Sequence, residues 1–187
     1  MRPSRPLIAA MLALVAAVAA GCTAEAKSTD TPSPFADCQG ITGQPVPPLP
    51  TLPDLKLPCF TGKEQIALRS VPGPLIINLW ASWCDPCRRE LPLMQKVATQ
   101  TTGRVTVIGV DTGDSREAGA SFAADKGVSF PMLFDPDKKL ANAIAGTNLP
   151  ITIFMDASGK SYVNRLPLDA AKLSTLVKQW TDMTVTP

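Results

Sequence analysis

Short apolar runs and amphipathic stretches alternate along the chain from about residue 55 onward. The runs at residues 75–79 and 104–110 are rich in Leu, Ile and Val, which is typical of strands that a sheet covers on both faces. After Cys84, apolar residues recur every three or four positions from Leu91 to Ala98, and this spacing predicts a helix. The pattern therefore predicts an α/β domain that opens with a strand, a helix and a second strand.

Local signals predict the remaining elements. Residues 114–117, Asp-Ser-Arg-Glu, resemble a capping box, and a helix is expected from there to about Gly127. The turn sequence at 157–160 predicts a hairpin. We expect three further strands, at 131–134, at 151–155 and, within the hairpin, at 161–165. We also expect a helix at 137–145 and an amphipathic helix from Asp169.

The first part of the chain has the composition of an export signal followed by a tether. Residues 7–20 are almost all Ala, Leu, Val, Ile and Met, and Arg2 and Arg5 precede them. The apolar run is shorter than the roughly 20 residues that a membrane-spanning helix needs. Ala19-Ala20-Gly21-Cys22 resembles a bacterial lipoprotein signal. Residues 1–21 are therefore the expected signal peptide and Cys22 the expected lipidation site.

An ordinary secretion signal and an uncleaved anchor are the alternatives, and all three place the domain outside the cytoplasm. Residues 22–53 are rich in Pro and Thr, with five prolines between 45 and 53, which disfavours a helix or a central strand. They are the expected tether and lead-in, and residues 54–187 are the expected domain.

Charge and composition exclude several classes of protein. Without its first 21 residues the chain carries 16 basic and 16 acidic residues, and no Lys/Arg cluster is interleaved with aromatic residues, which argues against nucleic-acid binding. The chain has no histidine. This absence excludes Ser-His-Asp and Cys-His hydrolases and histidine-ligated zinc or copper, so no metal site is expected.

The strongest chemical signal is the pair Cys84 and Cys87, which directly follows the strand at 75–79 and begins the first predicted helix. A helix N-terminus lowers the pKa of a thiol, and the thiolate is the reactive form. Cys84 is therefore the expected nucleophile and Cys87 the expected resolving thiol. An inert structural disulfide is the alternative.

Two further cysteines, Cys38 and Cys59, remain for pairing. Outside the cytoplasm they most simply form a structural disulfide that closes a loop of about 20 residues and stabilises the fold by about 3 kcal/mol. A second redox pair that relays electrons is the alternative.

Residues 78–92, from Asn78 to Pro92 around the cysteine pair, resemble the active-site segment of the exported TlpA/ResA-like branch of thioredoxin-fold proteins. The resemblance covers roughly residues 55–183. It implies a thioredoxin-like fold with a central mixed sheet flanked by helices, an N-terminal extension and an insert around residues 114–135. It also implies that no cofactor is needed, because electrons pass to or from another dithiol protein.

The resemblance assigns roles to further residues. Leu149-Pro150 matches a cis-proline signature that presents the backbone of Leu149 to a substrate peptide, and Trp83 is expected to pack at the site. Glu90 matches a glutamate that holds and transfers protons, since Asn78 stands where ordinary thioredoxins have a buried, titratable Asp. A plain turn proline and a surface glutamate are the alternatives.

These features predict a membrane-tethered thiol–disulfide oxidoreductase outside the cytoplasm, on the outer face of the bacterial cell membrane. The expected direction is reduction of exported protein disulfides, as in cytochrome c maturation, with a membrane-embedded dithiol protein as electron partner. A disulfide-forming oxidase and a non-catalytic binding module are the alternatives. A peroxiredoxin is disfavoured because Ala81 stands where its motif needs Thr, and a copper-delivery protein because the chain lacks a Cys-x-x-x-Cys motif and histidine.

Overall fold

The computed structural model describes residues 33–42 and 51–187, so the expected signal peptide and Cys22 lie outside the described residues. A five-stranded mixed sheet runs through the centre in the order β5-β4-β3-β6-β7. β3, β4 and β5 are parallel, whereas β6 and β7 are antiparallel to their neighbours. The strands are β3 (Leu75–Trp80), β4 (Thr106–Thr112), β5 (Met132–Asp135), β6 (Ile151–Met155) and β7 (Ser161–Asn164).

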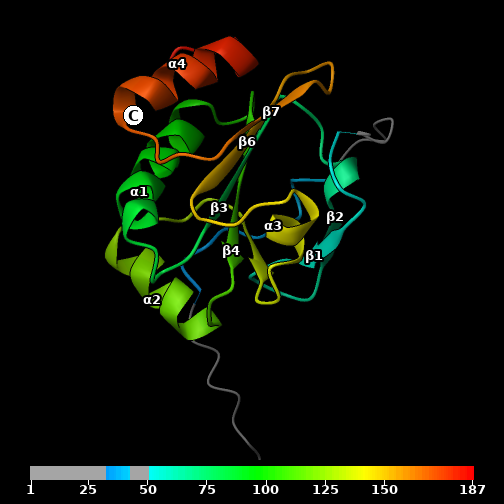
Figure 1. The fold of residues 1–187 in the computed structure, drawn as a ribbon, viewed down its shortest axis with the longest axis vertical. Helices are drawn as coiled ribbons and strands as arrows, with labels where there is room; N and C mark the ends of the chain where they lie inside the picture. Colours follow the sequence, from blue (N-terminus) through cyan, green and yellow to red (C-terminus); the bar gives the residue numbers. More distant parts are fainter. Residues whose placement is uncertain (1–32, 43–50) are drawn as a thin grey trace, which may run out of the picture.

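Helices cover both faces of this sheet (Figure 1). Three of them lie on one face, and a short helix together with a small two-stranded sheet lies on the other. On the first face are α1 (Asp85–Gln100), α2 (Arg116–Asp125) and α4 (Ala170–Thr181); on the second are α3 (Lys139–Ala143), β1 (Lys56–Pro58) and β2 (Gln65–Ala67), with a 3₁₀ turn at Leu68–Ser70.

The alternation of side chains along β3 divides the core into two layers. Ile76 and Trp80 pack with α1, α2 and α4, whereas Ile77 and Leu79 pack with α3 and the small sheet. Successive side chains of a strand point to opposite faces, so a strand that is apolar on both faces needs cover on both. All six residues of β3 are buried.

The segment ahead of the sheet packs on the domain. Phe35 is buried and its ring centroid lies 4.7 Å from that of Phe60. Cys38 is joined to Cys59 by a disulfide whose partners are 21 residues apart in the sequence. The backbone N–H of Ala36 donates to the carbonyl of Ser129 across 2.7 Å. Residues 33–42 are therefore attached to the domain by packing, a covalent bond and backbone pairing.

Several boundaries differ from the sequence-based expectations: β5 spans Met132–Asp135 and not 131–134, α3 spans Lys139–Ala143 and not 137–145, and α2 ends at Asp125 and not near Gly127. β4 spans Thr106–Thr112 instead of residues 104–110, and it extends past residue 110 because its last four residues pair with β5. The residue that caps α2 is Ser115, whose hydroxyl accepts from the N–H of Ala118 at 3.2 Å. Asp114, the first residue of the expected capping box, instead accepts from the N–H of Ser82 at 2.5 Å. Ser115 thus provides the local cap, and Asp114 makes a long-range contact instead.

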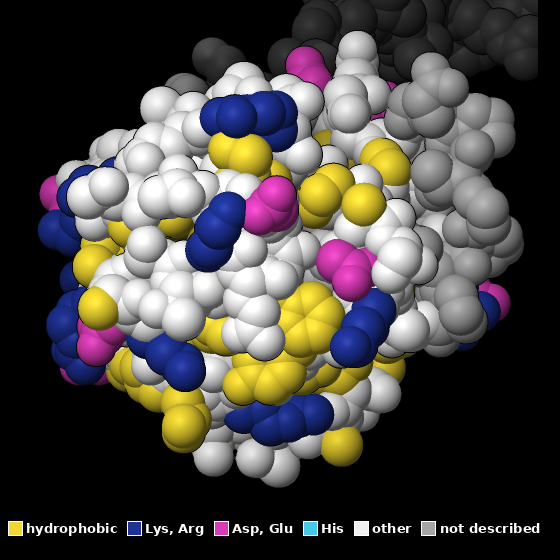
Figure 2. All heavy atoms as spheres, turned by 90° about the horizontal axis from the view of Figure 1, so that it is seen from above, with side chains coloured by type: hydrophobic (Ala, Val, Ile, Leu, Met, Phe, Trp, Pro, Cys, Tyr) yellow, Lys and Arg dark blue, Asp and Glu magenta, His cyan; other side chains and the backbone are white. Residues whose placement is uncertain are grey.

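Basic side chains are dispersed on the face seen from the end at which α4 lies (Figure 2). Lys and Arg lie there among apolar and acidic side chains. The described part of this face therefore lacks the continuous basic surface that favours nucleic acids. Within residues 33–42 and 51–187, no helix is both long enough and apolar enough to cross a membrane.

Candidate redox site

Cys84 and Cys87 form a disulfide at the N-terminus of α1. Cys84 is the N-cap residue, with an extended backbone, and its Sγ accepts a hydrogen bond from the N–H of Cys87 at 3.3 Å. Pro86 lies in the first helical turn, where its missing N–H leaves no partner unsatisfied. Cys84 is 5% exposed and Cys87 1% exposed, so Cys84 is the less buried residue of the pair.

The loop that precedes the disulfide is held by the segment between β4 and α2. The N–H of Ser82 donates to Asp114, and the indole Nε1 of Trp83 donates to the carbonyl of Gly113 at 3.0 Å. The Arg88 guanidinium donates to the carbonyl of Ser82 at 3.0 Å. These three bonds position the residues immediately before Cys84.

The charges within the cysteine motif are largely balanced. Asp85, between the two cysteines, forms an exposed ion pair with Arg89 one turn further along α1. Arg88 instead stacks over the ring of Phe122, with its guanidinium carbon 4.5 Å from the ring centroid. Both arginines are thus engaged on the helix surface, and Arg89 offsets the charge that Asp85 places near Cys84.

Glu90 is a buried carboxyl on α1, one turn after Cys87. Its Oε1 accepts from the amide of Asn78 at 2.7 Å and from the hydroxyl of Thr152 at 3.0 Å. Its Oε2 accepts from the N–H of Leu168 at 2.8 Å. Burial raises the pKa of Glu90 because it disfavours the charged form, and these hydrogen bonds oppose the rise. A carboxyl in this setting can hold a proton beside a redox pair.

A second buried carboxyl, Asp111, lies at the end of β4 opposite Trp80. No hydrogen-bond donor among the described residues reaches either of its oxygens. The pKa of Asp111 is raised to about 8, chiefly by burial and then by the nearby Asp114 carboxyl, while Arg116 opposes the rise. Sequence reasoning missed this residue, although an acidic residue at the end of a buried strand was a signal.

A hollow of about 300 Å³ borders the disulfide. It lies between the cysteine loop, the start of α3 and the loop before β6, and Trp83, Cys84 and Leu149 line it. Trp83 is 57% exposed. The Leu149–Pro150 bond is cis, and Pro150 itself is buried. The structure thus brings Leu149 and Trp83 to the same hollow as Cys84.

Lys138 also lines this hollow, and no sequence pattern singled it out. A larger hollow, of about 670 Å³, lies at the opposite end of β3 and β4, and neither Cys84 nor Cys87 lines it. The described residues hold no cluster of three or more Asp, Glu or Cys side chains arranged to bind a metal ion.

Comparisons with known proteins agree with this geometry. The model of the AhpC/TSA family matches residues 50–161. The thiol-disulfide oxidoreductase ResA of Bacillus subtilis (strain 168) is 30% identical over 102 residues, which are 54% of this chain and 57% of ResA. The thiol:disulfide interchange protein DsbE of Allochromatium vinosum is 33% identical over 141 residues, which are 74% of this chain and 71% of DsbE. The chain spans about three fifths of the length of the first curated relatives that it matches.

Solved structures show the same architecture. The structure of MTB DsbF superposes with a TM-score of 0.64 and 26% identity, covering 70% of this chain and all of DsbF. A thioredoxin-family thiol:disulfide interchange protein from Chlorobium tepidum TLS gives a TM-score of 0.61 and 26% identity, covering 74% and 99% of the two chains. The expected thioredoxin-like fold, with a central mixed sheet flanked by helices, is confirmed.

Proposed function

This chain belongs to the AhpC/TSA family, and we propose that it is a thiol–disulfide oxidoreductase acting through Cys84 and Cys87. The observation that carries the proposal is the disulfide at the start of α1, with its less buried cysteine at the edge of a hollow. The relatives named thiol-disulfide oxidoreductase and thiol:disulfide interchange protein support it. We assign Cys84 as the nucleophile, Cys87 as the resolving thiol, Leu149 and Trp83 as the substrate-binding wall, and Pro150 as the substrate-binding residue that presents the backbone of Leu149.

The reaction transfers two electrons through a mixed disulfide. The Cys84 thiolate attacks one sulfur of a substrate disulfide, and the other substrate sulfur leaves as a thiolate and takes up a proton. Cys87 loses its proton and attacks Sγ of Cys84. This step releases the second substrate thiolate and forms the Cys84–Cys87 disulfide, the oxidised state that this structure contains. Glu90 holds and returns the proton that the cysteines exchange.

The direction that we propose is reduction of exported protein disulfides, including those met in cytochrome c maturation. Glu90 supports this direction, because a carboxyl with a raised pKa near the site can take protons as Cys87 is oxidised. A membrane-embedded dithiol protein would then restore the reduced pair. A disulfide-forming oxidase runs the same steps in reverse and is the alternative.

The location that we propose is the outer face of the bacterial cell membrane. The apolar segment at 7–20 and Cys22 support export and lipid anchoring. Residues 22–53 then join the anchor to the domain, and the Cys38–Cys59 disulfide fits an oxidising compartment. Mass spectrometry of the mature N-terminus tests this anchor: a lipid-modified Cys22 supports it, and an unmodified N-terminus contradicts it.

The reduction potential of the Cys84/Cys87 pair tests the function. A dithiothreitol titration of the wild-type chain, with Cys84→Ser as control, is expected to give a value near or below about −250 mV, as for a reductant. A value of about −120 to −180 mV would select the oxidase. Cys87→Ser is expected to trap substrate in a mixed disulfide that Cys84→Ser cannot form. The absence of any redox transition in the wild type would overturn the enzyme assignment.

A further inference from the structure

The hollow beside the disulfide contains two charged side chains of opposite sign. Asp85 and Lys138 line it, and its other described lining residues are uncharged or are Cys84 itself. Asp85 forms an ion pair with Arg89 on α1. Lys138 forms no ion pair with any carboxylate in the described part of the chain. The hollow beside Cys84 therefore carries a positive charge that has no ion-pair partner among residues 33–42 and 51–187.

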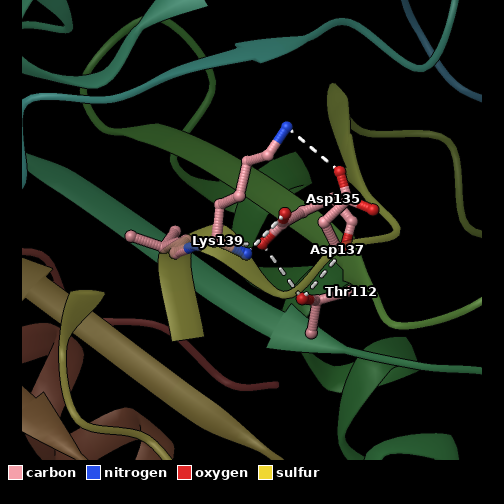
Figure 3. A network of polar contacts seen from close by, with 5 residues as sticks. Thr112, Asp135, Asp137 and Lys139 are labelled. Atoms are coloured by element: carbon pink, nitrogen blue, oxygen red, sulfur yellow. Dashed lines mark hydrogen bonds and ion pairs between the residues drawn. The ribbon is translucent and has the colours of Figure 1, made fainter. Parts of the chain in front are cut away.

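The backbone around Lys138 is held from the sheet. Asp135, at the end of β5, accepts from the N–H groups of Lys139 at 2.8 Å and Leu140 at 2.9 Å, and from the hydroxyl of Thr112 at 3.1 Å (Figure 3). Lys138 is the N-cap residue of α3 and has a φ of 57°. This left-handed conformation is uncommon for a residue other than glycine. The hydrogen bonds to Asp135 therefore hold the backbone of Lys138 in a conformation that lysine rarely adopts.

The side chain of Lys138 is directed toward the cysteine loop. Its aliphatic stem lies over Gly113, where an added Cβ would overlap it. Its Nζ lies 5.8 Å from the centroid of the Trp83 ring, within the range of a cation–π contact. The neighbouring Lys139 is different, because its ammonium pairs with Asp137 at 3.1 Å (Figure 3). Among the described residues, therefore, Lys139 is paired with a carboxylate and the adjacent Lys138 is not.

These contacts assign a selective role to Lys138. We infer that the hollow binds the substrate segment next to the substrate cysteine that reacts with Cys84, and that Lys138 favours substrates with an Asp or Glu close to that substrate cysteine. This inference rests on the proposed function. Leu149 and Trp83 supply apolar contact in the same hollow. Lys138 is exposed, so its attraction is screened by solvent and salt, and a preference of about three- to fivefold is expected.

Two synthetic peptides test the inference. Each carries one intramolecular disulfide, and the two differ only by Glu or Gln next to the first cysteine. Reduced full-length protein is mixed with each peptide, and the second-order rate of peptide reduction is followed chromatographically. The wild type is expected to reduce the Glu peptide about three to five times faster at low salt, with the ratio falling toward one in about 1 M salt.

Matched variants distinguish Lys138 from its surroundings. Lys138→Met is expected to bring the ratio to one, Lys138→Arg to keep it, and the control Lys139→Met to leave it unchanged. A wild-type ratio of one, or an equal loss in Lys139→Met, would overturn the role of Lys138. Failure of the wild type to reduce either peptide would instead overturn the proposed function. Equal and rapid reduction of both peptides overturns the selectivity alone.

Discussion

Asn78 donates its side-chain amide to Oε1 of Glu90 across 2.7 Å, and both residues are buried. The amide comes from the central strand β3 and the carboxyl from α1, so the bond joins the sheet to the helix that carries the cysteines. The Thr152 hydroxyl, from β6, accepts from the Asn78 amide at 3.0 Å and donates to the same Glu90 oxygen at 3.0 Å. Asn78 cannot take up a proton, which leaves Glu90 as the titratable group of this network.

Replacement of that carboxyl tests its part in proton transfer. Glu90→Gln keeps the shape but cannot exchange a proton, so the rate of disulfide reduction should fall by about 100-fold. Because burial raises the pKa of Glu90, the wild-type pH–rate profile is expected to have an inflection above the usual range of a glutamate. This inflection should be absent in Glu90→Gln. Stopped-flow rates from pH 4 to pH 9 measure both. Wild-type rates and an unchanged profile in Glu90→Gln would assign Glu90 a structural role.

Asp111 should make stability depend on pH. Its ordinary pKa is 3.8 and burial raises it to about 8 in the fold, so between these values the folded state holds a proton that the unfolded state has released. Stability should therefore fall as pH rises, by about 1.4 kcal/mol per pH unit at most, and level off above about pH 8. Asp111→Asn cannot titrate, so its stability relative to wild type should increase across this range. Urea unfolding at pH 5, 6, 7 and 8 measures the difference; a constant difference would refute the raised pKa.

Gly119 on α2 makes room for the same carboxyl. A Cβ at this position would overlap Oδ2 of Asp111, so Gly119→Ala should lower the free energy of unfolding by about 1–3 kcal/mol. Removing the carboxyl relieves the overlap, and Gly119→Ala should cost far less in an Asp111→Ala background. A double-mutant cycle measured by urea unfolding gives the coupling. Equal costs in the two backgrounds would show that the two positions are independent.

The Cys38–Cys59 disulfide should act on stability alone. It closes a loop between residues 21 apart, and the double variant Cys38→Ser/Cys59→Ser should lose about 3 kcal/mol of unfolding free energy. The reduction potential of Cys84/Cys87 should stay the same, because each pair belongs to a different layer of the core. Unfolding curves and a dithiothreitol titration check the two results. A shifted potential would favour the alternative in which Cys38 and Cys59 relay electrons.

Local sequence was enough to locate the cysteine helix and several other elements. β6 spans the predicted residues 151–155, because Pro150 and Asp156 bound a run rich in β-branched and apolar residues. α4 begins after Asp169, whose carboxylate accepts from the N–H of Lys172 at 2.8 Å. Such features depend on near neighbours in the chain, which a sequence displays directly. The small strands β1 and β2 were not predicted, since three residues are too few for a periodic signal.

The sequence by itself determined the strand–helix junction that carries Cys84 and Cys87, the cysteines available for pairing and the resemblance that implied Glu90. Tertiary structure alone decided how these groups are surrounded. The partners of Glu90 lie 12, 62 and 78 residues away, and Lys138 reaches the hollow from α3 through contacts with Gly113 and Trp83. The burial of a side chain and the identity of its hydrogen-bond partners depend on segments that come together only in the folded protein. The pKa of a carboxyl and the charge that lines a hollow are therefore set by tertiary structure.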